Sequence, residues 1–182
     1  MTLLAVSNFL AILVVVAGVG SLVVIGLRLT AVFSERAAGG LDRLRAAIGP
    51  YALWLAWLVA ATAMAGSLYF SELGGLMPCA LCWYQRIAMY PLAVILLIAA
   101  IRGDGGIRPY VTVLAAIGAL IAGYHVLVQR IPGLPTGSCS VEASCSAIDL
   151  ERFGFITIPV MALVGFLTIL VLVGILASPT DE

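Results

Sequence analysis

The sequence alternates five long apolar segments with shorter polar ones. Each apolar segment is close to or above the roughly 20 residues that a helix needs to cross a membrane. The pattern predicts an all-α membrane protein whose spans are residues 1–27, 51–70, 84–101, 109–129 and 153–177. The first span has no charged side chain and lacks the basic start and small-residue cleavage site of a signal peptide. We therefore expect it to be retained as a membrane helix.

The polar segments divide the chain into parts. Residues 29–50 are hydrophilic, and Gly39-Gly40 predicts a break in any continuous helix there. Pro159 falls inside the last predicted span, where it indicates a kink or a packing feature. We expect an extra N-terminal transmembrane helix at 1–28, a cytoplasmic linker at 29–50, a four-helix domain at 51–177 and a cytoplasmic tail at 178–182.

Composition and charge agree with a membrane protein. Apolar residues make up 63% of the chain and charged residues only 10%, well outside the range of soluble domains. The net charge is zero, so nothing indicates a nucleic-acid partner. One set of loops carries Arg28, Arg36, Arg43, Arg45, Arg102 and Arg108, and the other carries Arg130 and Arg152. The positive-inside rule places the first set in the cytoplasm, and the N-terminus and cysteine loops outside.

The candidate chemistry lies in four cysteines that form two close pairs. Cys79 and Cys82, with two residues between them, lie where a polar loop becomes a long apolar helix, and a helix N-terminus favours the thiolate. Arg86 follows Cys82 by one turn, so both side chains share a face about 6 Å apart along the axis. Cys139 and Cys145 lie in a long loop rich in Gly, Pro and Ser, which is typical of a functional loop.

Both cysteine pairs enclose very short stretches of chain. By constraining the unfolded chain, a disulfide in such a small ring contributes only about 2 kcal/mol to stability, so neither pair is well placed to be a major structural disulfide. Both suit a bond that forms and breaks, and the outer side of a membrane is where disulfides persist. The permanent charge of Arg86 beside Cys82, at the edge of a span, indicates electron transfer.

The chain contains a series of recognisable segments: GSLYFSE at 66–72, PCALCWYQRIAMYP at 78–91, Tyr124-His125, Gln129, Cys139, Cys145 and FGFITIPVMAL at 153–163. In this order, over residues 51 to 172, they resemble the DsbB/BdbC family of membrane disulfide-forming oxidoreductases. The short spacing of the second cysteine pair is closer to the BdbC branch. The resemblance implies a DsbB-like four-helix transmembrane bundle, to which this chain adds one N-terminal transmembrane helix.

The resemblance also implies a function in a bacterial cytoplasmic membrane. Such a protein reoxidises a DsbA-like thiol oxidase of the thioredoxin fold on the outer side and passes the electrons to a membrane quinone, menaquinone or ubiquinone, without a metal. It implies that Cys79 and Cys82 are the quinone-proximal pair, whereas Cys139 and Cys145 meet the partner. The residues expected to bind quinone are Arg86, Trp83, His125 and Gln129.

Other interpretations stay open from the residues alone. Trp83 also fits an interfacial aromatic belt, and His125 a hydrogen bond within the bundle. A vitamin K epoxide reductase type of protein pairs the same elements, but there the loop cysteines precede the CxxC. The rival of another class is a non-enzymatic membrane protein with structural disulfides or a four-cysteine zinc site. The wide gap between Cys139 and Cys145 is unusual for zinc ligands.

Overall fold

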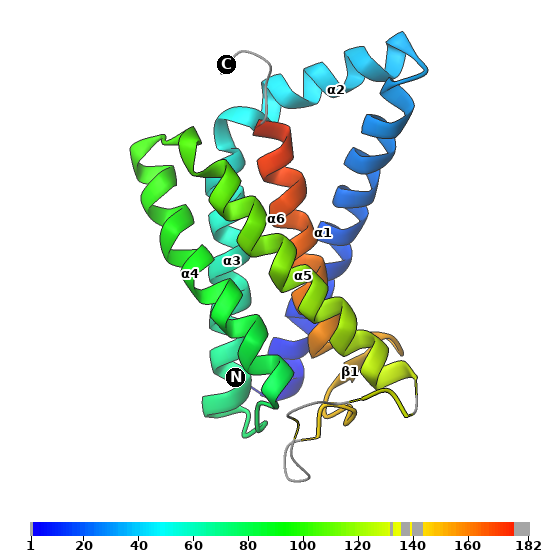
Figure 1. Ribbon diagram of the computed structural model, residues 1–182, viewed down its shortest axis with the longest axis vertical. Helices are drawn as coiled ribbons and strands as arrows, with labels where there is room; N and C mark the ends of the chain where they lie inside the picture. Colours follow the sequence, from blue (N-terminus) through cyan, green and yellow to red (C-terminus); the bar gives the residue numbers. More distant parts are fainter. Residues whose placement is uncertain (1, 132, 136–138, 140–143, 177–182) are drawn as a thin grey trace.

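The computed structural model describes residues 2–131, 133–135, 139 and 144–176. Within them, five helices are long and apolar enough to cross a membrane, which confirms the five predicted spans and the all-α class. Four of them correspond to α1 (Leu3–Ala31), α4 (Ala80–Arg102), α5 (Arg108–Arg130) and α6 (Ile158–Leu176) (Figure 1). The remaining one is the continuous helical stretch Glu35–Leu73, in which α3 (Ala52–Leu68) continues into a π-helix, Tyr69–Leu73. The predicted end of the last span at Ala177 and the tail 178–182 lie outside the described residues.

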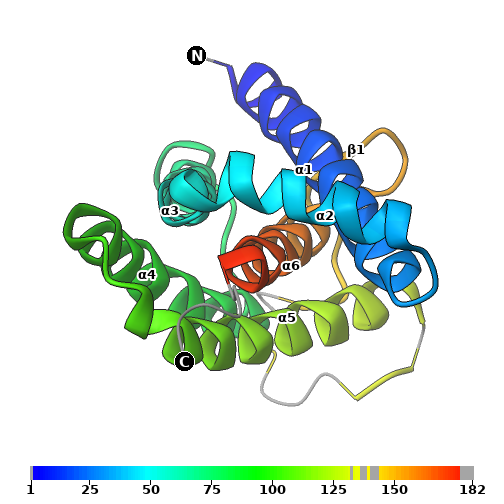
Figure 2. The ribbon, with the colours of Figure 1, turned by 90° about the horizontal axis from the view of Figure 1, so that it is seen from above.

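Helices α3 to α6 form the bundle that the resemblance implied. Helix α6 packs against α3 and α5, and α4 packs against α3 and α5. Seen along the helices, α6 lies at the centre (Figure 2). Its Phe166 and Ile169 are fully buried, as are Leu92 and Leu96 of α4. Small residues on the buried side of α3, such as Ala56, let neighbouring backbones approach closely.

Helix α1 packs along α6, outside the four-helix bundle. Two polar contacts fix it there. The buried hydroxyls of Ser21 and Thr168, on α6, lie 3.1 Å apart. Near the other end, Arg152 donates from Nε to the buried Ser7 Oγ at 2.8 Å. Helix α1 is therefore held in one position against the bundle.

The prediction that Gly39-Gly40 breaks the linker was wrong. Helix α2 (Glu35–Ile48) runs through both glycines and is followed by a 3₁₀ turn, Gly49–Tyr51. Each glycine weakens a helix by about 1 kcal/mol relative to alanine. The packing of α2 on α1 offsets that cost, with Leu41 buried. Helix α2 joins α1 to α3 at the end of the bundle away from the cysteines (Figure 1).

The last span begins later than predicted. Residues from Phe153 onward first complete a hairpin between β1 (Glu151–Arg152) and β2 (Ile156–Thr157), which pair antiparallel. Phe153 and Gly154 both have positive φ, 52° and 74°, in the connecting turn. Ile156 of the hairpin is buried, so the sequence is apolar in the hairpin as well as in the helix. The start of α6 therefore could not be recognised from the apolar pattern. Pro159 therefore lies in the first turn of α6, where its missing N–H costs no hydrogen bond, and not in the helix interior.

The loops that join the helices separate into two ends of the bundle. The start of α1, the segment before α4 and the loop from α5 to α6 meet at one end (Figure 1). We call it the cysteine end, because all four cysteines lie in or beside these segments. Helix α2 and the 3₁₀ turn Gly105–Ile107, between α4 and α5, lie at the opposite end.

Candidate active site

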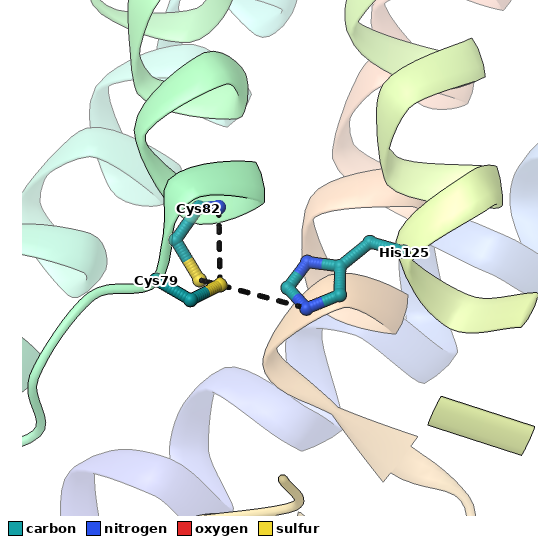
Figure 3. Close-up of side chains that lie close together, drawn as sticks. All are labelled: Cys79, Cys82 and His125. Atoms are coloured by element: carbon teal, nitrogen blue, oxygen red, sulfur yellow. Dashed lines mark hydrogen bonds between the residues drawn. The ribbon is translucent and has the colours of Figure 1, made fainter. Parts of the chain in front are cut away.

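Cys79 and Cys82 lie at the start of α4, as predicted. Cys79 is the N-cap residue, and its Sγ accepts a hydrogen bond from the backbone N–H of Cys82 at 3.4 Å. The two sulfurs are free and lie 3.0 Å apart in a hydrogen bond (Figure 3). Capping geometry thus turns both thiols toward each other at a helix N-terminus.

His125, on α5, links this pair to the second one. Its Nε2 lies 3.1 Å from the backbone oxygen of Cys145. The same atom lies 3.7 Å from Cys79 Sγ (Figure 3). Because a carbonyl can only accept, Nε2 carries the proton. Nδ1 then accepts from the Gln85 side-chain amide at 3.1 Å. His125 is buried, so this network fixes its ring and aims one donor at both cysteine segments.

Cys79 has the environment of a stabilised thiolate. Its sulfur receives hydrogen bonds from the Cys82 thiol and backbone N–H and from His125. The Cys82 thiol is the main cause that lowers the pKa of Cys79 from 9.0 to about 4, with His125 adding to it and burial opposing it. When this pair is reduced, one of its sulfurs is therefore anionic at neutral pH.

Cys139 and Cys145 are disulfide-bonded, with their Cα atoms 5.8 Å apart. Cys145 is fully buried and packs in one cluster with Cys79, Leu81 and Val128. Cys139 lies at the edge of that cluster and is only half-buried. The fold thus brings the two pairs together and leaves one cysteine of the second pair nearer to solvent.

Arg86 lies one turn beyond Cys82 and is buried. It donates from Nε to Ser67 Oγ at 2.9 Å and from Nη2 to the Ser67 carbonyl at 3.0 Å. Its Cζ also lies 5.0 Å from the ring centroid of Trp83, a cation–π contact. In the part of the chain that the structure describes, its hydrogen bonds go to neutral oxygens, so its charge remains available to an anionic ligand.

A cavity of about 550 Å³ opens beside Cys82 and Arg86. Its walls come from α1, α3, α4 and α6, and most of its lining is apolar. The polar lining residues nearest the cysteine end are Ser67, Ser71, Cys82, Gln85, Arg86 and Asp149. An apolar chamber of this size with a few convergent polar groups is typical of a small-molecule site.

The other residues predicted to bind quinone lie away from this cavity. Trp83 is half exposed and stacks on Arg86 from outside the lining. Gln129 donates to the Ala147 carbonyl at 3.0 Å and accepts from Thr157 Oγ1 at 2.8 Å, so it ties α5 to the loop and to β2. His125 lies between the cysteine pairs. Among the predicted quinone ligands, the cavity is lined only by Arg86.

Sequence analysis missed two polar residues of the site. Gln85 orients His125 and also lines the cavity. Its spacing of three from Cys82 places both on one helix face, which is a signal that could have identified it. Ser67 holds Arg86, and its only signal was its place in the segment GSLYFSE.

A four-cysteine zinc site does not fit this geometry. The disulfide between Cys139 and Cys145 leaves neither sulfur as the thiolate that zinc requires. Among the residues that the structure describes, Cys79, Cys82 and His125 place three potential ligand atoms within 4.8 Å of one another, one fewer than a closed tetrahedral site needs.

Comparison with known proteins identifies the family. A family model described as disulfide bond formation protein DsbB matches residues 50–176. The chain belongs to the DsbB family. It is 46% identical over 131 residues to disulfide bond formation protein C of Bacillus subtilis (strain 168), covering 71% of this chain and 95% of that protein. No solved structure matches it.

Other DsbB-family relatives are similar to the same extent. A probable disulfide formation protein C 2 of Bacillus anthracis is 45% identical over 128 residues, covering 70% of this chain and 91% of the relative. A probable disulfide formation protein of Coxiella burnetii is 44% identical over 119 residues, covering 64% and 81%. The chain is thus a multi-pass membrane protein of a disulfide-forming oxidoreductase family. Helices α1 and α2 lie before the matched region.

Proposed function

We propose that this DsbB-family protein oxidises a thioredoxin-like thiol oxidase of the DsbA type and passes the electrons to a membrane quinone, menaquinone or ubiquinone. The observation that carries the proposal is that Cys82 and Arg86 share the wall of one largely apolar cavity. Cys82 belongs to a reactive cysteine pair, and the second pair packs against it. Such a site would connect the Cys139–Cys145 disulfide, whose Cys139 is half-buried, to a lipid-soluble acceptor.

The cavity residues fit a quinone. A quinone supplies a two-electron acceptor with an apolar tail and carbonyl oxygens that gain negative charge on reduction. Arg86 would hold one such oxygen with a charge that cannot be lost by deprotonation, and Gln85 offers a second donor beside it. A buried charge at membrane depth costs at least a few kcal/mol. Binding of the quinone oxygen would explain why this position is an arginine despite that cost.

Burial suggests the order in which the cysteines react. A partner thiolate attacks the half-buried Cys139, which forms a mixed disulfide and releases Cys145 as a thiolate. This exchange starts from the oxidised form of the inner pair, in which Cys79 and Cys82 are disulfide-bonded. Cys145 attacks Cys79, the Cys79–Cys82 bond breaks, and Cys82 leaves as a thiolate beside the cavity. The second thiol of the partner attacks the mixed disulfide and releases Cys139. The partner then departs with its own disulfide formed.

The remaining steps restore both pairs. The freed Cys139 attacks Cys145 in its bridge to Cys79, which re-forms the outer disulfide and leaves Cys79 and Cys82 reduced. Oxidation of these two sulfurs delivers two electrons to the quinone, and the quinol forms with one proton from the remaining thiol and one from water. The net reaction converts a partner dithiol and a quinone into a partner disulfide and a quinol. Arg86 and Gln85 orient the acceptor, and His125 holds the two cysteine segments together.

We further propose that the cysteine end faces the outside of the bacterial cytoplasmic membrane. The end formed by α2 and the turn after α4 carries most of the arginines, which favours the cytoplasm. This orientation leaves the Cys139–Cys145 disulfide where disulfides persist. Residues 51–177 would be the catalytic unit, with 1–28 an added span and 29–50 a cytoplasmic connection.

The test is a single turnover without oxygen. The purified protein is fully reduced, mixed with a soluble menaquinone or ubiquinone analogue, and quenched with a thiol-trapping reagent that reports each cysteine. We expect Cys79 and Cys82 to become protected first, with one quinol formed per pair. The matched variant Cys82→Ser should form no quinol. If the cysteines of the wild type stay reduced after quinone is added, the proposal is refuted.

A further inference from the structure

Helix α1 supplies a long apolar wall of the cavity. The lining residues on this helix are Phe9, Leu10, Leu13, Val14, Val16 and Ala17. They extend for about 12 Å along the helix. Facing them are Leu58 of α3 and Met161 of α6, which are also apolar. The part of the cavity that α1 lines therefore suits a hydrocarbon chain more than a polar ligand.

The position of α1 is tied to the polar end of the cavity. A Cβ on Gly66 would lie only 2.8 Å from Leu10 Cδ1, which is too close for any side chain larger than glycine. Helices α1 and α3 therefore touch there because residue 66 is a glycine. Ser67, the next residue, holds Arg86. Together with the Ser21–Thr168 and Arg152–Ser7 contacts, this packing is more than a membrane anchor requires.

We infer that α1 is part of the quinone site and binds the isoprenoid tail. This inference rests on the proposed function, in which the quinone ring lies against Cys82 and Arg86. A ligand held there by its polar ring must direct its apolar tail into the remaining volume, and α1 forms one side of that volume. Because α1 precedes the part of the chain that matches the family model, the tail site is an addition to the family's unit. A protein with this tail site should prefer quinones that have a long isoprenoid tail.

The experiment compares a long-tailed quinone with a tail-less analogue of the same ring. Leu13→Trp and Ala17→Leu each add bulk to the wall, whereas Ile12→Trp places the same bulk on a position that is 54% exposed and does not line the cavity. The readout is kcat/KM for the long-tailed quinone divided by kcat/KM for the tail-less one. We expect this ratio to fall about tenfold in both wall variants and to stay at the wild-type value in Ile12→Trp.

The outcomes separate this inference from the proposed function. If the wild type reduces neither quinone, the proposed function fails. If it reduces both and the ratio is the same in all variants, α1 does not bind the tail, which is also the result expected if a phospholipid acyl chain occupies the groove. If Leu13→Trp loses turnover with both quinones, the kcat/KM ratio of Ala17→Leu decides whether α1 binds the tail. That variant adds fewer atoms, and residue 17 lies two helical turns from Phe9 along the cavity wall.

Discussion

Arg86 donates to both the hydroxyl and the backbone carbonyl of Ser67, at 2.9 and 3.0 Å. This pair joins α4 to α3 at the cysteine end and fixes the direction of the guanidinium. A flexible arginine would swing toward water, as long cationic side chains do at membrane interfaces. In the proposed reaction, a charge held in this way is already in place when the quinone gains electrons, which is how preorganised groups contribute most.

The first prediction concerns Arg86. Arg86→Ala should slow quinone reduction by about 100-fold, because a preorganised charge at the acceptor is lost. Disulfide exchange between the partner and Cys139 should continue at the wild-type rate, since Arg86 does not contact that pair. Quinol formation and thiol trapping, measured separately, test the two parts. The matched control is Arg130→Ala, which removes an exposed ion pair with Glu151 at the same end and should leave both rates unchanged. Equal quinone turnover in Arg86→Ala would remove Arg86 from the mechanism.

The second prediction concerns pH. Because the pKa of Cys79 is lowered to about 4, the thiolate is present throughout pH 5 to 8 and is lost only as the pH falls through the lowered value. Alkylation of the reduced pair by iodoacetamide should therefore be nearly flat from pH 8 down to about 5, where an ordinary thiol would slow roughly tenfold per pH unit. The rate is measured by mass spectrometry of Cys79.

His125 contributes to that lowered pKa, so His125→Ala should move the alkylation midpoint of Cys79 upward. The control is Gln129→Ala, on the same helix, whose side chain bonds to the Ala147 carbonyl and Thr157 and not to a cysteine. It should keep the wild-type profile. A wild-type rate that climbs steadily between pH 6 and 9 would contradict the assignment of a stabilised thiolate.

The third prediction concerns the outer pair. In the reduced protein, a charged maleimide should label the half-buried Cys139 faster than the fully buried Cys145, by about tenfold or more, since reaction requires access. A thioredoxin-like partner that lacks its resolving cysteine should accumulate a mixed disulfide with Cys139 in the Cys145→Ser variant. The reciprocal variant, Cys139→Ser, should trap much less. Preferential trapping on Cys145 would reverse the proposed order.

Sequence patterns predicted the parts of this fold that depend on one segment at a time. Apolar length located the spans, and the cysteine spacing located the start of α4, because both are local properties. The errors arose where packing outweighs local preference. Gly39 and Gly40 stay helical because α2 rests on α1. The apolar residues after Phe153 first form a hairpin, since burial of Ile156 does not distinguish a strand from a helix.

The site was predictable where its residues share a helix. Cys82 and Arg86 lie on one face of α4 at a spacing that the sequence shows directly. The contacts of His125 with Cys79 and with the Cys145 carbonyl join three segments far apart in the chain, and no single-segment pattern contains them. The same holds for Ser67 and for the α1 wall of the cavity, because each depends on how separate helices pack.

The last prediction tests that packing. A Cβ on Gly118 of α5 would overlap ring atoms of the fully buried Phe166 on α6, so Gly118→Ala must displace a central core side chain. We expect a loss of about 1–3 kcal/mol of stability, seen as a lower Tm of the purified protein in detergent. Gly123→Ala is the matched control on the same helix, because nothing lies within 4 Å of the Cβ position there. Its Tm should equal or slightly exceed that of the wild type, since alanine favours a helix over glycine by up to about 1 kcal/mol. If the two variants melt together, α5 and α6 do not approach through Gly118, and the bundle that positions His125 against the cysteines is packed differently.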